Sequence, residues 1–151
     1  MTRILITGMS GVGKSTLLAA LSQEGHLTID TDYGDWKTAA GLWDEDLMTA
    51  ALHTHADVVV AGTVENQGEF YDRFDHIVLL SAPLSVILQR VMHRAENPYG
   101  KTAAQRAEIE ENLKSVEPLL RRGATMEIDA GQSTADTART IEALLAGRRS
   151  T

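Results

Sequence analysis

Residues 8–15 combine glycines, a lysine and a serine in a spacing suited to holding phosphate groups. They read Gly-Met-Ser-Gly-Val-Gly-Lys-Ser and fit the pattern G-x-x-x-x-G-K-[S/T] at every fixed position. The glycines let the backbone turn tightly and direct successive N–H groups onto one phosphate. We expect Lys14 to reach the β- and γ-phosphates, and the Ser15 hydroxyl to ligate a Mg²⁺ ion that bridges them. The pattern therefore predicts a P-loop that binds a nucleoside triphosphate.

The segments on either side of this motif give it the context that it requires. Residues 3–7 are an apolar run of strand character, and residues 14 to about 23 are helix formers. The N-terminus of this helix adds partial positive charge where the phosphates would bind. The residues expected at the phosphates are Gly8, Ser10, Gly11, Val12, Gly13, Lys14, Ser15 and Thr16.

Asp30 and Asp32 are the strongest candidates for chemistry after Lys14. They follow a short predicted strand over residues 27–29. In an open parallel sheet, ligands bind beyond the carboxyl ends of the strands, so we expect both carboxylates to face the P-loop. A role as loop caps or turn formers is the alternative.

The rest of the chain alternates predicted helices and strands. The helices span residues 35–55 (mainly helical, with a break at Gly41), 83 to about 95, 102 to about 122, and 134 to about 145. The strands span residues 57–61, 75–80 and 125–128. A capping box at residues 102–105 opens the third of these helices. This order predicts an α/β fold in one domain over residues 1–151, a five-stranded parallel sheet with helices on both faces.

Composition excludes several other functions. The 151 residues are enough for one domain with a full core. The net charge of −7 argues against a nucleic acid or an anionic membrane as partner. The absence of cysteine excludes disulfides and cysteine catalysis. We expect no signal peptide and no transmembrane segment, and therefore a cytoplasmic location. The sequence does not indicate an oligomeric state.

With these features the chain resembles, over nearly its whole length, the small P-loop kinases. The group includes the nucleoside-monophosphate kinases, shikimate kinase and gluconate kinase. Residues 27–32, Leu-Thr-Ile-Asp-Thr-Asp, fall where shikimate kinases have Asp-Thr-Asp, and residues 118–126 fall on the end of their lid helix and last strand. The resemblance implies ATP and Mg²⁺ as cofactors, and an adenine held near residues 129–133, including Asp129. It also implies a short lid over residues of about 95–118.

By position, the resemblance implies that Asp30 holds a water molecule on Mg²⁺ and that Asp32 accepts the proton of the attacking hydroxyl. Ser15 and Asp30 are thus the expected metal ligands, because no acidic residue ends the strand at 57–61, and Glu65 is the alternative to Asp30. Arg90 and Arg94 lie four apart on one helix face. We expect Arg94 to contact phosphate or adenine with Arg90 assisting, and surface salt bridges are the alternative. The expected catalytic residues are Lys14, Asp32 and Arg94.

The acceptor side departs from the shikimate kinase pattern. No arginine lies between Arg3 and Arg73, and Val116-Glu117 precedes Pro118 where that family has an arginine. A buried anionic acceptor without a cationic partner is costly, which also counts against a nucleoside-monophosphate kinase. Lys37 is the only lysine or arginine between Lys14 and Arg73.

The acceptor side offers carboxylates, amides and aromatic rings instead. The expected acceptor contacts are Asp32, Tyr33, Trp36, Gly62, Glu65 and Asn66. This set suits a neutral or cationic hydroxyl compound, such as a nucleoside, a sugar or an amino-bearing metabolite. Trp36 and Trp43 are seven apart, so core positions on one helix face are an alternative for both.

The sequence therefore favours a P-loop kinase that phosphorylates a small-molecule acceptor. A nucleoside-monophosphate kinase that holds its acceptor phosphate with Lys37, Arg73 and lid arginines is the second hypothesis. A nucleotide-binding switch with slow hydrolysis and a protein partner is the third. For the charged helix over residues 102–122, a mobile lid and a solvated surface helix both stay open.

Overall fold

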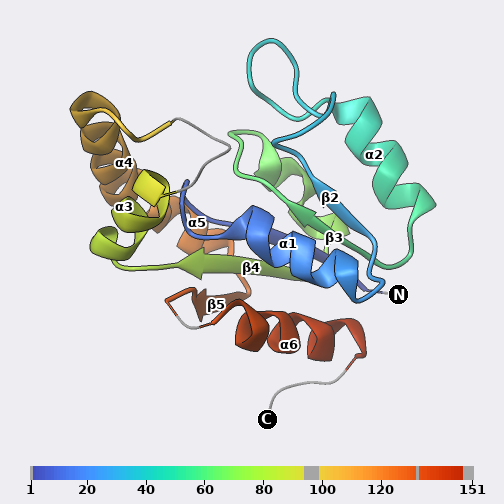
Figure 1. Cartoon of the computed structure of the whole chain (residues 1–151). Helices are drawn as coiled ribbons and strands as arrows, with labels where there is room; N and C mark the ends of the chain where they lie inside the picture. Colours follow the sequence, from blue (N-terminus) through green and yellow to red (C-terminus); the bar gives the residue numbers. More distant parts are fainter. Residues whose placement is uncertain (1, 94–98, 132, 148–151) are drawn as a thin grey trace.

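The computed structural model describes residues 2–93, 99–131 and 133–147, which form a β-sheet covered by helices (Figure 1). The strands are β1 (Arg3–Thr7), β2 (Thr28–Asp30), β3 (Val58–Ala61), β4 (His76–Ser81) and β5 (Met126–Asp129). The helices are α1 (Lys14–Gln23), α2 (Glu45–Thr54), α3 (Leu84–His93), α4 (Ala103–Ser115), α5 (Glu117–Gly123), α6 (Thr134–Leu145) and the 3₁₀ helix η1 (Gln67–Arg73). None of the described helices has the length and apolar character needed to span a membrane.

The five strands are parallel and lie in the order β2-β3-β1-β4-β5. Alternate residues of β1 face opposite sides of the sheet. Ile4 and Ile6 pack in the hydrophobic cluster that contains α1 and α6, whereas Leu5 packs with residues of α2 and η1. In Figure 1, α1 and α6 run next to each other along the sheet. The predicted five-stranded parallel sheet with helices on both faces is confirmed.

The strand order explains where a site can form. Because β1 lies between β3 and β4, the loops that follow these strands meet at one edge of the sheet. The P-loop follows β1, residues 62–66 follow β3, and Asp32 lies two residues beyond β2. The residues that are predicted to have chemical roles therefore follow the carboxyl ends of neighbouring strands.

Residues 35–55, predicted to be mainly helical, are helical only in α2, and the earlier part of that prediction is wrong. Gly34 and Gly41 have φ of +81° and +79°, a conformation that suits glycine and interrupts a helix. Lys37 and Trp43, on either side of Gly41, form an antiparallel bridge. The segment before α2 is therefore a hairpin-like loop.

The prediction of a single helix over residues 102–122 is also wrong, because this segment forms two helices, α4 and α5. Pro118 stands in the first turn of α5, where it has no N–H to continue a helix from the preceding turn. Thr102 caps α4 as predicted, accepting from the Gln105 N–H at 3.1 Å. The Gln105 side chain accepts from the Gly100 N–H instead of completing the predicted capping box. The other predicted elements begin and end within about two residues of the described ones.

Candidate active site

The loop between β1 and α1 is shaped to receive a phosphate. Gly11 has φ of +90°, and a Cβ there would lie 2.7 Å from a methyl group of Val91 in α3. Gly13 caps α1 in the left-handed conformation, with no side-chain hydrogen bond to the helix. The first N–H groups of α1 therefore have no side-chain cap and point toward the space where a phosphate would bind.

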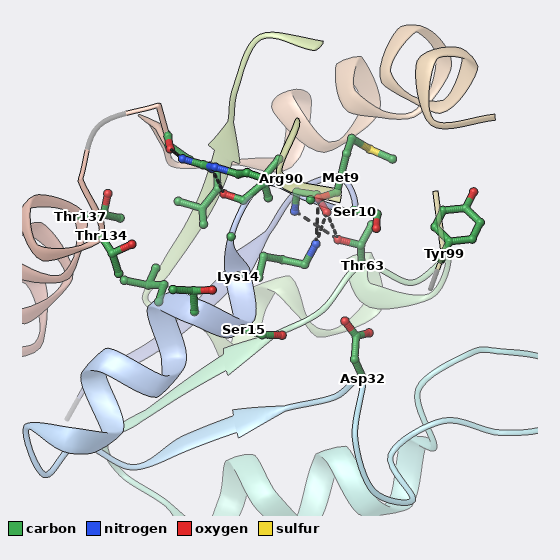
Figure 2. A pocket seen from close by; sticks show the side chains of 18 of the residues that line it. Met9, Ser10, Lys14, Ser15, Asp32, Thr63, Arg90, Tyr99, Thr134 and Thr137 are labelled. Atoms are coloured by element: carbon green, nitrogen blue, oxygen red, sulfur yellow. Dashed lines mark hydrogen bonds between the residues drawn. The ribbon is translucent and has the colours of Figure 1, made fainter. Parts of the chain in front are cut away.

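The Lys14 side chain folds back over the first residues of the P-loop. Its Nζ donates to the carbonyl oxygen of Gly8 at 2.5 Å and to that of Met9 at 3.2 Å. Figure 2 shows the ammonium group inside the loop, beside the Thr63 hydroxyl. The lysine thus lies within the concave side of the loop, where phosphates would bind.

Ser15 and Asp30 lie next to each other across the gap between α1 and β2. The Ser15 hydroxyl donates to Asp30 Oδ2 at 2.6 Å, and Asp30 Oδ1 accepts from the Asp32 N–H at 3.1 Å. A hydroxyl and a carboxylate oxygen are ligands that Mg²⁺ prefers. Among the described residues, no group of three His, Cys, Asp or Glu side chains forms a complete metal cage. A pair of protein oxygens fits an ion that takes its other ligands from phosphates and water.

The Asp32 carboxylate points toward the P-loop from the opposite side of the cavity (Figure 2). It forms an ion pair with Lys37, whose Nζ lies 3.1 Å from Asp32 Oδ1. Both side chains are partly exposed, so the pair is screened by water. Tyr33 lies beside them and is 58% exposed.

A cavity of about 1110 Å³ joins the P-loop to Asp32. Besides residues 8–17, it is lined by Asp32, Tyr33, Lys37, Thr63, Leu80, Arg90, His93, Tyr99, Ala130, Thr134 and Thr137. In Figure 2, Thr134 and Thr137 lie at one end, and Asp32 and Tyr99 lie toward the other. The cavity therefore has room for a nucleotide along the P-loop and an acceptor near Asp32.

Arg90 connects the P-loop to the loop after β5. Its guanidinium donates to the carbonyl oxygens of Val12 at 2.9 Å and of Ala130 at 2.5 Å. It makes no salt bridge among the described residues, so the alternative of a surface ion pair does not hold for Arg90. Arg94, predicted as catalytic, lies outside the described residues, and so does part of the predicted lid, at residues 95–98.

Several predicted acceptor contacts lie outside the cavity lining. Asn66 uses its whole side-chain amide on Trp43, accepting from its N–H at 3.0 Å and donating to its carbonyl oxygen at 3.1 Å. Gly62 packs against Thr31 and the Trp43 indole. Glu65 is exposed.

Trp36 and Asp129 are further predicted contacts outside the lining, and Asp30, the predicted metal ligand, is not among the lining residues either. Trp36 packs at the edge of the cluster formed with α2. Asp129 Oδ1 accepts from the Gly131 N–H at 2.8 Å and shapes the loop whose next residue, Ala130, reaches the cavity. Trp43 is a core residue, 1% exposed, although it does not stand on a helix.

The expected site residues did not include six that line the cavity: Thr63, Leu80, His93, Tyr99, Thr134 and Thr137. Thr63 follows β3 between the predicted acceptor contacts Gly62 and Glu65, so its position was a usable signal. Thr134 and Thr137 lie on the first turns of α6, and nothing in their local sequence marks them. Their place follows from the packing of α6 against α1.

Comparison with solved structures defines the class of protein to which this fold and site belong. The shikimate kinase of Acinetobacter baumannii, in complex with shikimate, is 22% identical with a TM-score of 0.72, covering 97% of this chain and 94% of that one. A gluconokinase from Sinorhizobium meliloti 1021 is 21% identical with a TM-score of 0.67, covering 97% and 92%. Deoxyadenosine kinase from M. mycoides, with bound dATP, is 14% identical with a TM-score of 0.67, covering 96% and 100%. The chain therefore has the fold of the small P-loop kinases of the nucleoside-monophosphate kinase and shikimate kinase-like group.

At the level of sequence, residues 4–111 match the AAA domain family, and the chain belongs to that family. No curated protein matches the sequence. At these identities the structural likenesses establish the fold alone.

Proposed function

We propose that the chain is an ATP- and Mg²⁺-dependent kinase that transfers a phosphoryl group to a hydroxyl of a small neutral or cationic molecule. The proposed acceptor classes are nucleosides, sugars and amino-bearing metabolites. The observation that carries this proposal is the single cavity that holds the P-loop on one side and Asp32 on the other. The P-loop kinase fold supports phosphoryl transfer in general.

The nucleotide half of the site follows from the loop geometry. The N–H groups of the P-loop and the uncapped start of α1 bind the phosphates, and Lys14 moves onto the β- and γ-phosphates. Arg90 fixes the Ala130 loop to the P-loop, so that the adenine and phosphate positions keep a constant separation. Ser15 and Asp30 are the residues that would hold Mg²⁺, which neutralises phosphate charge when bound.

Asp32 is the proposed base at the acceptor. Phosphoryl transfer needs positioning and positive charge more than a strong base, so one carboxylate beside the attacking hydroxyl is sufficient. Lys37 orients that carboxylate through the ion pair at 3.1 Å. The predicted contribution of Arg94, which lies outside the described residues, and of a closing lid formed with α4 stays a prediction.

The charge of the acceptor side supports a neutral or cationic acceptor. Within the described lining, Lys37 is the cation nearest Asp32, and that carboxylate already pairs with it. Arg90 is held by two carbonyl oxygens on the nucleotide side. An anionic acceptor would have to take Lys37 away from Asp32, the group proposed to activate it.

A nucleoside-monophosphate kinase is the second candidate, and Lys37 is the observation that favours it. This lysine lines the cavity and its side chain is partly exposed, so an acceptor phosphate could reach it. The two candidates differ in whether a monophosphate or its uncharged nucleoside is the better acceptor.

The experiment that tests the proposal is ADP release from ATP and Mg²⁺ with a panel of acceptors. The panel contains nucleosides, nucleoside monophosphates, sugars, shikimate and aminoglycosides, and the Lys14→Ala variant serves as the blank. We expect one neutral or cationic acceptor to stimulate ADP release. Stimulation by a monophosphate alone would favour the second candidate, and release that no acceptor stimulates would contradict both.

A further inference from the structure

Thr63 stands at the cavity wall with every hydrogen-bonding position of its hydroxyl in use. Its Oγ1 donates to the Gly8 carbonyl oxygen at 2.6 Å and accepts from the Gly8 N–H at 3.2 Å. The Thr7 hydroxyl lies 3.0 Å away. It must donate to Thr63, because the single Thr63 hydrogen is used on Gly8. Gln67 Nε2 donates to Thr7 at 3.1 Å, which is consistent with this direction.

The Gly8 carbonyl oxygen is also an acceptor for Lys14, at 2.5 Å. A carbonyl oxygen has two lone pairs, and here Thr63 and Lys14 occupy both. Gly8 is buried, and a buried carbonyl without a donor costs free energy. If Lys14 turned to a phosphate, the hydrogen bond from Thr63 would still satisfy Gly8.

The strand order explains why a residue after β3 can form hydrogen bonds with Gly8. β1 and β3 are neighbours, with Ile6 paired to Ala61, so the residues that follow the two strands lie side by side. The Gly62 N–H donates to the Ile6 carbonyl oxygen at 3.1 Å, which continues the ladder up to Thr63. Thr63 therefore meets the first glycine of the P-loop as a direct extension of the sheet.

We propose that Thr63 is a positioning residue of the phosphate site, acting through Gly8 and Lys14. The inference rests on the proposed function, in which Lys14 binds the β- and γ-phosphates. Thr63 fixes both backbone polar groups of Gly8, and it keeps the carbonyl hydrogen-bonded when Lys14 leaves. It thereby lowers the free-energy cost of transferring the Lys14 ammonium group from the protein to the nucleotide.

The test is the ADP affinity of Thr63→Val, measured by calorimetry in the presence of Mg²⁺. Valine keeps the branched shape and removes the hydroxyl, so we expect ADP affinity to fall about tenfold. Thr63→Ser restores the hydroxyl and is expected to bind ADP nearly as well as the wild type. Thr63→Ala gives the same comparison if the valine variant does not fold.

Thr125 provides a matched control. Like the Thr63 hydroxyl, its hydroxyl bonds to both backbone groups of one residue. It accepts from the Ile77 N–H at 2.8 Å and donates to the Ile77 carbonyl oxygen at 3.2 Å. Ile77 stands near the amino end of β4, and neither residue lines the cavity. Both Thr125→Val and Thr63→Val are expected to lower the unfolding temperature, and Thr125→Val is expected to leave ADP affinity unchanged.

A second comparison places Thr63→Val in the Lys14→Ala background. If Thr63 acts through Lys14, removing its hydroxyl costs much less ADP affinity when the lysine is already absent. An unchanged ADP affinity in Thr63→Val, or equal losses in both backgrounds, would overturn the inference. A wild-type chain that does not bind ADP would contradict the proposed function itself, which separates the two failures.

Discussion

The Ser15 hydroxyl donates to Asp30 Oδ2 at 2.6 Å and thereby connects the first turn of α1 to the last residue of β2. The two residues are fifteen positions apart in the chain. Their contact brings a neutral and a charged oxygen ligand together at the edge of the phosphate site. We attribute the Mg²⁺ requirement of the proposed reaction to this pair of residues.

Asp30→Asn is expected to raise the Mg²⁺ concentration needed for half-maximal ADP release by about 10- to 100-fold. Asparagine keeps an oxygen for the Ser15 hydroxyl but removes the charge that favours the ion. A titration of activity against Mg²⁺ measures the shift. Asp35→Asn is the control, because Asp35 is an exposed carboxylate in the loop that follows β2, whereas Asp30 accepts the hydrogen bond from Ser15. An unaltered Mg²⁺ titration would remove Asp30 from this role.

Asp32→Asn is expected to lower the rate of phosphoryl transfer by about 10²- to 10⁴-fold, because an amide cannot accept the acceptor's proton. Binding of ADP is expected to persist, since Asp32 lies on the acceptor side of the cavity. Single-turnover kinetics and ADP calorimetry together separate the two steps. A variant that turns over at the wild-type rate would show that another group accepts the proton.

Gly62→Ala is expected to destabilise the fold by about 1–3 kcal/mol, because overpacking in a well-filled core forces neighbours to move. The added Cβ would lie 2.2 Å from Thr31 Oγ1 and 3.2 Å from a ring carbon of Trp43. Thr31 cannot easily move away, since its hydroxyl is bonded to Ala61 and to Trp43 Nε1. Chemical denaturation measures the loss of stability.

Gly68→Ala is the control for this substitution. A Cβ at Gly68 meets no atom within 4 Å, so its stability should stay within about 0.5 kcal/mol of the wild type. Equal effects at the two glycines would contradict the packing around Trp43.

Glu127 makes a small contribution to stability that depends on pH. Its hydrogen bonds with Arg121 and then with Ser81 hold the pKa of the Glu127 carboxyl below its ordinary value of 4.5. A lowered pKa in the folded state stabilises the fold above pH 4.5, and this contribution is lost as the pH falls through the folded-state pKa. Because Glu127 is partly exposed, the effect should be about 0.2–1 kcal/mol.

Glu127→Gln should accordingly reduce the loss of stability between neutral and acidic pH. Urea denaturation at a series of pH values measures this slope. Glu111→Gln, at an exposed position of α4, serves as the control and should leave the slope unchanged. If the stability of Glu127→Gln depended on pH as steeply as that of the wild type, the contribution assigned to Glu127 would be contradicted.

The sheet could be predicted from the sequence because its strands and helices are marked by strong local patterns. The valine run of β3 and the glycines of the P-loop have few other interpretations. The loop before α2 could not be predicted, because its shape depends on contacts with a distant residue, Asn66, which binds both backbone groups of Trp43. Periodicity within residues 35–55 carries no information about such a contact.

The nucleotide side of the candidate site was predictable for a related reason. Its P-loop residues are contiguous, so their spacing alone predicted their grouping, whereas Arg90, Thr134 and Thr137 come from other elements. The acceptor side is assembled from separate segments, and proximity in the sequence was a poor guide there. Thr63 reaches the cavity, whereas its near neighbours Glu65 and Asn66 do not line it. The direction of each side chain after β3 decides this, and the sequence does not specify that direction.

The most direct test of the account follows the γ-phosphate itself by ³¹P NMR, with ATP, Mg²⁺ and the acceptor that best stimulates ADP release. We predict that the γ-phosphate signal is replaced by that of a phosphate ester on the acceptor, in step with ADP. The Lys14→Ala variant should leave ATP intact. A reaction that yields inorganic phosphate alone, whatever acceptor is present, would contradict the kinase and favour a nucleotide-hydrolysing switch.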